Sequence, residues 1–231
     1  MTSRAIMLLS GGLDSSVALM MARAEYDFAV ALTFDYGQRA APREIEAART
    51  LCARHAILHE VIELPWLRRI TTTSLVNRQS SVPPATIETL DETHAAHERM
   101  RGVWVPNRNG LFANVAACYA EAREAPIIIV GFNAEEAVTF SDNSAACAQA
   151  LTEAFAYSTQ IHPTVVSPTM PMRKEEIARV AVREGLTAFW SCYFGGDKMC
   201  GICESCLRTV RAFRAADAFN LIAARFECFP G

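Results

Sequence analysis

The stretch MLLSGGLDSSVALMMA, residues 7–22, decides the fold of this chain. Residues 5–9 form an apolar run typical of a short buried strand, and the apolar spacing after the serines is that of one side of a helix. The turn between them holds two glycines, a carboxylate and serines. Because glycine permits close backbone approaches, we expect the amides of Gly11, Gly12 and Leu13 to face a bound anion at a helix N-terminus.

The composition predicts one folded domain with a small appendage. The chain has 231 residues, of which 51% are apolar and 20% are charged. A net charge of -3 and a pI near 6.0 give no electrostatic footprint for broad nucleic-acid binding. No apolar stretch reaches membrane-spanning length and no signal peptide is evident, so we expect a cytoplasmic protein without a membrane partner. We assign residues 1–190 to the main domain and residues 191–231 to a cysteine-rich C-terminal region.

Strands and helices are expected to alternate along the chain. The expected strands cover residues 5–9, 28–34, 57–64, 127–133 and 164–168, and helices cover residues 43–54, 111–124 and 174–184. This order predicts an α/β fold with a doubly wound parallel sheet. Ligands of such folds bind beyond the carboxyl ends of the strands. The loops that follow Leu9, Phe34, Val130 and Pro168 would all meet there.

Residues 65–105 interrupt the alternation with a stretch rich in Thr, Ser, Pro and His. An ordinary connection has only about 4–6 residues. We therefore expect a lid with short helices over the site. The alternative is a flexible surface insertion.

Four of the eight cysteines are bunched near the C-terminus. Cys192, Cys200, Cys203 and Cys206 follow the pattern C-x7-C-x2-C-x2-C, which is typical of a closed structural Zn²⁺ site. An iron–sulfur cluster also takes four cysteines, but nothing in the loop chemistry requires electrons. The four other cysteines are expected to be small buried apolar residues: Cys52, Cys118, Cys147 and Cys228.

The loop SGGLDSS, residues 10–16, lacks the lysine of a Walker loop. It resembles the pyrophosphatase loop of the adenylating N-type ATP pyrophosphatases. The resemblance implies an ATP site in which Asp14 also places a magnesium ion or fixes the loop. The residues assigned to ATP are Leu9, Ser10, Gly11, Gly12, Leu13, Asp14, Ser15, Ser16 and Asp35. A helix N-cap with a tight turn is the alternative.

Three further blocks narrow the resemblance: TFDYGQRAAPREIEAA (33–48), VPNRNGLF (105–112) and SCYFGGDKMCGICESCLRTVRAF (191–213). With the loop they resemble the 7-cyano-7-deazaguanine synthase family over nearly the whole chain. The resemblance implies an adenine nucleotide alpha hydrolase-like fold and a zinc-binding helical tail. It also implies that ATP activates 7-carboxy-7-deazaguanine as an adenylate, that ammonia gives the amide, and that a second activation gives the nitrile. A homodimer is expected from the resemblance alone.

Attack on the α-phosphorus requires groups that neutralise charge in the transition state. We assign Arg108 and Lys174 to this role. Asp14 is a third catalytic candidate, because the resemblance implies that it places a magnesium ion or fixes the loop. Arg108 could instead be a surface residue at a helix start, and Lys174 could pair with a glutamate along its helix.

Two segments are expected to touch the ligands. Tyr36, Gln38 and Arg39 follow the second strand beside Asp35, although a plain turn also explains these residues. After the fourth strand, members of the family carry an Asp-Tyr-Ser-Gly-Tyr-Pro-Asp-Cys-Arg-like segment, whereas this chain has NAEEAVTFSDNSAACAQAL (133–151). We expect its carboxylates to accept hydrogen bonds from a guanine-like edge: Glu135, Glu136 and Asp142. A solvated helix start is the alternative.

The altered 133–151 segment leaves other functions open. The activated base could be joined to an amine of a protein or another macromolecule. A tRNA thiolase would need a reactive cysteine near the loop and a basic RNA surface, and neither is clear. A zinc-stabilised nucleotide sensor without turnover is the candidate that is not an enzyme.

Overall fold

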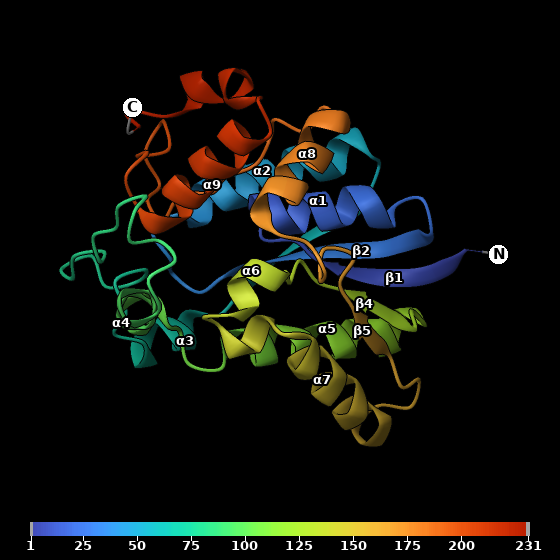
Figure 1. Ribbon diagram of the computed structural model, residues 1–231. Coiled ribbons are helices and arrows are strands. Elements are labelled where there is room, and N and C mark those ends of the chain that lie inside the picture. Colours follow the sequence, from blue (N-terminus) through green and yellow to red (C-terminus); the bar gives the residue numbers. More distant parts are fainter. Residues whose placement is uncertain (1, 230–231) are drawn as a thin grey trace.

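The computed structural model describes residues 2–229 and contains a five-stranded parallel sheet (Figure 1). The strands lie in the order β3-β2-β1-β4-β5. Their bounds are β1 Ser3–Leu8, β2 Tyr26–Asp35, β3 His59–Glu63, β4 Ile127–Ile129 and β5 Thr164–Val166. This parallel α/β architecture confirms the fold class predicted from the alternation of elements.

Helices cover both faces of the sheet (Figure 1). One face carries α1 (Leu13–Ala22), α2 (Ala41–Arg54), α8 (Lys174–Arg183) and α9 (Glu204–Ala215), and the other carries α5 (Arg108–Arg123) and α7 (Ala145–Ser158). Side chains alternate between the two cores along each strand: Ala31 and Ile129 belong to the first core, and Leu32 and Ile128 to the second. This alternation explains why the strands are apolar without interruption.

The last two strands are shorter than predicted, because they end at Ile129 and Val166. Gly131 lies against the start of α1, where an added Cβ would be 2.6 Å from Cα of Ser15. The chain beyond β4 therefore passes close to the first residues of α1. This close passage brings the end of β4 to the predicted ligand edge.

The 65–105 segment contains α3 (Pro65–Ile70) and α4 (Thr93–Val103). Leu75 and Leu90, which lie between these helices, are buried. The segment lies beside the C-terminal residues, in the left part of Figure 1. Short helices α6 (Ala134–Ala137) and η1 (Ser141–Asn143) lie in the altered segment after β4.

The C-terminal region packs into the first core. Met199, Cys203 and Phe213 belong to the same buried cluster as residues of α1 and α8. Beyond α9 the chain forms two short 3₁₀ helices, η2 (Phe219–Leu221) and η3 (Ala223–Arg225). Among the described residues, no helix has both the length and the apolar character needed to cross a membrane.

Candidate active site at the carboxyl edge of the sheet

The loop between β1 and α1 is held in a sharp turn. Gly11 has φ +76°, and an added Cβ would lie 2.2 Å from the carbonyl oxygen of Glu44, so only glycine fits. The amides of Gly12 and Leu13 donate at 3.2 Å to the hydroxyls of Ser10 and Ser191. Two of the amides expected to face an anion are thus hydrogen-bonded to hydroxyl groups.

Lys174 brings three distant segments together at this loop. Its Nζ atom lies 2.5 Å from Oδ2 of Asp14 and 2.6 Å from Oε1 of Glu136. Lys174 is buried, and although burial lowers the pKa of a lysine, the two carboxylates raise it above its ordinary value. Lys174 therefore stays charged beside the phosphate loop.

Asp14 has an unusual environment for a carboxylate. Burial raises its pKa to about 6, and Lys174 opposes that shift. Oδ1 of Asp14 is buried without a hydrogen-bond partner among the described residues, as is Oγ of Ser16. Buried polar atoms normally have partners, so these two atoms indicate a ligand at the loop.

A cavity of ≈220 Å³, which we call the loop cavity, opens beside the loop. Phe34 and Phe112 form one wall, with ring centroids 4.0 Å apart and planes 5° apart. Polar lining residues include Ser10, Asp14 and Ser15 from the loop and Arg108, Asn109, Glu136 and Asn143 from elsewhere. The cavity thus combines an apolar wall for a flat ring with a polar end for phosphates.

A second cavity of ≈120 Å³, the tail cavity, adjoins the first. Both are lined by Arg108, Glu136 and Asn143, so the two cavities meet there. The tail cavity, unlike the loop cavity, is also lined by Leu75, Val103, Thr139, Phe140, Lys174, Tyr193, Glu204, Ser205 and Arg208. Two bound molecules could therefore meet beside Arg108 and Lys174.

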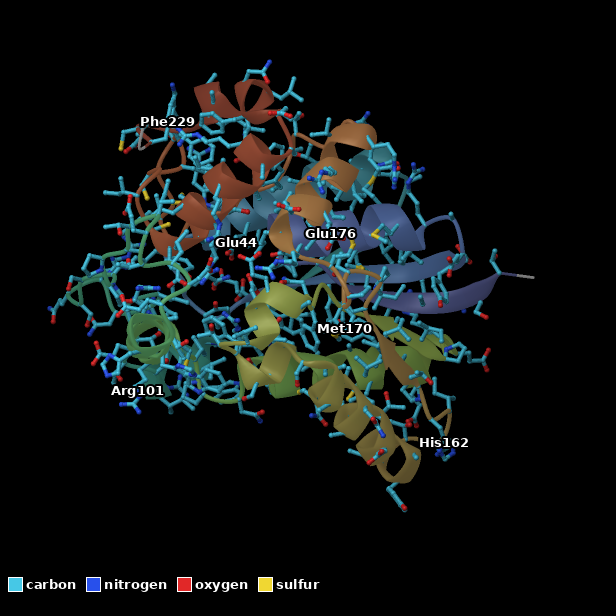
Figure 2. The ribbon with its side chains drawn as sticks, in the orientation of Figure 1. Glu44, Arg101, His162, Met170, Glu176 and Phe229 are labelled. Carbon is cyan, nitrogen blue, oxygen red and sulfur yellow. The ribbon has the colours of Figure 1, made fainter. Side chains whose placement is uncertain are left out.

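Glu44 is a site residue that the sequence analysis missed. It lines the loop cavity and accepts a 2.8 Å hydrogen bond from Nε2 of Gln38. Burial raises the pKa of Glu44 to about 7. Figure 2 shows Glu44 near the middle of the molecule. Glu44 lies in α2, where no sequence pattern distinguishes it from the other glutamate of the helix.

Of the residues predicted after β2, Tyr36 and Gln38 line the loop cavity. The Tyr36 hydroxyl lies 3.5 Å from Nη1 of Arg108. Asp35 lines neither cavity, and its Oδ1 caps the turn by accepting from the amide of Gly37. The structure therefore shows a turn around Asp35.

Arg39 lies outside both cavities. Its Nη2 donates to the carbonyl oxygens of Asn77 and Ser80, and its guanidinium carbon lies 5.5 Å from the ring centre of Phe194. The structure thus gives Arg39 a different position from the predicted substrate contact. It joins the 65–105 segment to the C-terminal region.

The three acidic residues of the altered segment have different positions. Glu136 lines both cavities. Glu135 lines neither, because Arg208 and Arg211 hold it through ion pairs of 2.9 and 2.8 Å. Asp142 is also absent from both linings, although its Oδ1 is buried without a partner among the described residues. Of these three carboxylates, Glu136 is the one that lines the two cavities.

The four clustered cysteines form a compact group. Their sulfurs all lie within 4.8 Å of one another, and those of Cys200 and Cys206 are 3.9 Å apart. A tetrahedral zinc ion with bonds of about 2.3 Å places its sulfurs about 3.8 Å apart. The group therefore fits one metal ion with four thiolate ligands.

The remaining cysteines differ from the prediction that all are buried. Cys52 is buried and Cys147 is partly buried, but Cys118 and Cys228 are exposed. Cys118 lies on α5 outside the buried stripe of Ala113, Ala116, Ala117 and Ala120. Because alanines occupy both faces of this helix, the sequence does not show which face is buried, and the prediction that Cys118 is buried was wrong.

A match to a known protein family shows to which family this chain belongs. A model described as "Queuosine biosynthesis protein QueC" matches residues 4–217. The chain belongs to the QueC family. A relative from Carboxydothermus hydrogenoformans named 7-cyano-7-deazaguanine synthase is 50% identical over 211 residues, 90% of this chain and 97% of the relative. Another of that name, from Methanosarcina barkeri, is 48% identical over 92% of this chain and 94% of the relative.

Among solved structures, the chain matches the U34-tRNA thiolase NcsA from Methanococcus maripaludis. The match has a TM-score of 0.49 and 14% identity, and it covers 81% of this chain and 59% of that one.

Membership of the QueC family confirms the resemblance found in the sequence, and with it the prediction of an ATP-using enzyme. The curated relatives favour neither conjugation to a macromolecule nor thiolation. In this QueC-family chain, the two joined cavities at the sheet edge are the candidate active site.

Proposed function

We propose that the chain is an ATP-dependent ligase that converts 7-carboxy-7-deazaguanine and ammonia into 7-cyano-7-deazaguanine. The observation that carries this proposal is the junction of the two cavities at Arg108 and Glu136, with the phosphate loop on one side. That arrangement suits the transfer of an adenylyl group between two bound molecules. The names of the relatives at 48–50% identity agree with it.

In this proposal the loop cavity binds ATP. The adenine ring packs in the apolar part beside Phe34 and Phe112, and the phosphates lie at Ser10 and Ser15. When phosphate oxygens arrive, the amides of Gly12 and Leu13 exchange their hydroxyl partners for these anions. The start of α1 then stabilises the negative charge.

The carboxylate of the base reacts at the junction of the cavities. One of its oxygens attacks the α-phosphorus, the bond to pyrophosphate breaks, and an acyl adenylate forms. Lys174 and Arg108 neutralise the charge that develops on the phosphoryl oxygens, because both are cations that border the tail cavity. Burial makes this neutralisation stronger than it would be in water.

The loop also fits a magnesium ion. The buried, unpartnered Oδ1 of Asp14 is a hard oxygen ligand beside the phosphate loop. When bound, such an ion supplies further neutralisation of the ATP phosphates. Lys174 keeps Asp14 ionised by pairing with its other oxygen.

Nitrile formation then needs one substitution and one elimination at the same carbon. Ammonia attacks the acyl carbon, AMP leaves, and a proton is lost to give the amide. The amide oxygen attacks a second ATP and releases pyrophosphate. Loss of AMP and of the remaining N–H protons leaves the carbon–nitrogen triple bond.

The four cysteines are proposed to bind zinc in a structural role. Four thiolates close the coordination sphere, so no position remains for a substrate. Cys203 and Cys206 lie at the start of α9, whose Glu204 and Arg208 line the tail cavity. The metal thereby holds one wall of that cavity. Reduced thiols agree with a cytoplasmic location, and a homodimer remains a proposal from the resemblance.

Release of pyrophosphate tests this proposal. Folded, metal-loaded protein should release pyrophosphate from ATP when 7-carboxy-7-deazaguanine is added, even without ammonia. Guanine, which has no carboxylate, is the control and should give none. Absence of base-dependent pyrophosphate would contradict adenylation and favour a nucleotide sensor.

A further inference from the structure

Glu204 is a carboxylate of the tail cavity that the proposed chemistry does not use. It is only 5% exposed, begins α9 directly after Cys203, and lines the tail cavity. It does not line the loop cavity. Among the described residues that line the tail cavity but not the loop cavity, it is the one carboxylate. A ligand here would meet a fixed hydrogen-bond acceptor.

Two arginines hold this carboxylate in place. Arg99 donates from Nε to Oε2 of Glu204 at 3.0 Å, and Arg208 donates from Nε and Nη2 to Oε1 at 3.1 and 2.9 Å. The Arg99 and Glu204 side chains are each 7% exposed. These three hydrogen bonds fix the position and orientation of the Glu204 carboxyl group.

Arg208 has no donor left for a ligand. Its Nη1 donates to Glu135 and Asp91, and its Nη2 also donates to the carbonyl oxygen of Leu90. With the bonds to Glu204, all five N–H groups of the guanidinium are used. Arg208 therefore positions Glu204 and does not itself bind the ligand.

Glu204 still has acceptor capacity. A carboxylate offers about four lone-pair sites, and three are occupied by the two arginines. The remaining site is on Oε2, which accepts only from Arg99 among the described residues. One N–H group of a bound molecule can occupy it.

We infer that Oε2 of Glu204 accepts a hydrogen bond from the exocyclic amino group of the base in the tail cavity, and so selects a 2-amino-substituted ring. This inference rests on the proposed function. The base carboxylate lies at the junction with Arg108, and the ring extends between Leu75, Val103 and Tyr193 toward α9. Its amino edge then meets Glu204, a role that the sequence analysis gave to Glu135, Glu136 and Asp142.

The inference is tested with a substrate analogue that lacks only the 2-amino group. Wild-type protein should use 7-carboxy-7-deazaguanine at least about tenfold better, in kcat/KM for base-dependent pyrophosphate release, than the analogue. In Glu204→Gln this preference should fall to within about threefold. If Glu204 had only a structural role, Glu204→Gln would lower activity toward both bases equally and leave the preference unchanged.

Asp91→Asn is the matched control. It makes the same acid-to-amide change on another partner of Arg208, but Asp91 lies outside the tail cavity. The preference for the amino-bearing base should persist in this variant. Zinc content and ATP affinity, measured for both variants, report whether the fold is intact.

A second variant covers the case in which Glu204→Gln does not fold. Glu204→Asp keeps the negative charge for both arginines but withdraws it by one methylene, and should also lose the preference. Wild-type protein that uses both bases equally well, or a folded Glu204→Gln that keeps the full preference, would overturn the inference. Absence of base-dependent pyrophosphate release from wild-type protein would instead contradict the proposed function.

Discussion

Nζ of Lys174 lies 2.5 Å from Oδ2 of Asp14, so the first residue of α8 is bound to the second residue of α1 across 160 positions of sequence. The same ammonium contacts Glu136 at 2.6 Å. One cation between two carboxylates keeps the phosphate loop and α6 at a fixed separation. It also places a positive charge at the junction of the two cavities.

Lys174→Gln should lower kcat by at least about 100-fold, because the transition state loses a buried cation. The melting temperature should fall as well, since Asp14 and Glu136 then face each other without their partner. Steady-state kinetics and thermal unfolding measure both effects. Arg179→Gln is the control on the same helix, because Arg179 makes an exposed pair with Glu175. Near wild-type kcat in folded Lys174→Gln would contradict the assigned role.

Glu44→Gln should change how stability depends on pH. The pKa of Glu44 is raised from 4.5 to about 7, so between these values the folded chain keeps a proton that the unfolded chain releases. Stability supplied by this group is present below the unfolded pKa and is lost as the pH rises through about 7. The free energy of unfolding of Glu44→Gln, relative to that of wild type, should therefore rise by on the order of 1–3 kcal/mol between about pH 4 and about pH 8.

Urea denaturation at about pH 4 and at about pH 8 measures this difference in the free energy of unfolding between Glu44→Gln and wild type. Glu46→Gln is the control, because Glu46 is an exposed glutamate of the same helix with a side chain 64% accessible. A difference between Glu44→Gln and wild type that stays constant with pH would show that Glu44 titrates normally.

Cys203→Ser should lower metal content and stability together. Binding energy at a structural zinc site is folding energy, on the order of 10 kcal/mol in small peptides, of which a larger domain loses only part. Activity should fall because α9, with Glu204, loses its anchor. Elemental analysis and thermal unfolding measure the effect, with the exposed Cys118→Ser as control. A folded variant that binds ATP and base normally yet has no turnover would contradict the structural role and indicate that the metal takes part in catalysis.

Arg108→Gln should lower kcat/KM for the base by about 100-fold, because this cation lines both cavities. The melting temperature should change little, since its contacts to Tyr36 and Asn109 are long, at 3.5 and 3.4 Å. Arg101, at the margin of the molecule in Figure 2, provides the control Arg101→Gln. Equal losses of kcat/KM in Arg108→Gln and Arg101→Gln would contradict a role for Arg108 in the reaction.

The fold could be predicted because local patterns determine it. Apolar runs and helical spacing located every strand of the sheet, and the glycines of the loop marked the turn. Strand ends were less accurate, because the departure of the chain after Ile129 depends on packing between Gly131 and Ser15. Only the folded structure contains that contact.

The site was predicted where the family motif or spacing carried it, and less well where long-range contacts decide. Asp14, Arg108 and Lys174 came from motifs and do lie around one junction. Glu135 pairs with Arg208 and Arg211 and lines neither cavity, and this pairing depends on how α9 docks. Glu204 lies between Cys203 and Cys206 in the sequence, and the cysteine pattern alone determined how this stretch was interpreted.

The most direct test follows the base itself by mass spectrometry. Folded, metal-loaded protein is incubated with ATP, 7-carboxy-7-deazaguanine and ¹⁵N-labelled ammonia. The account predicts free 7-cyano-7-deazaguanine carrying one ¹⁵N atom, together with AMP, and neither nitrile nor amide when ammonia is omitted. Unchanged carboxylate, or base attached to a macromolecule with no free nitrile, would contradict it.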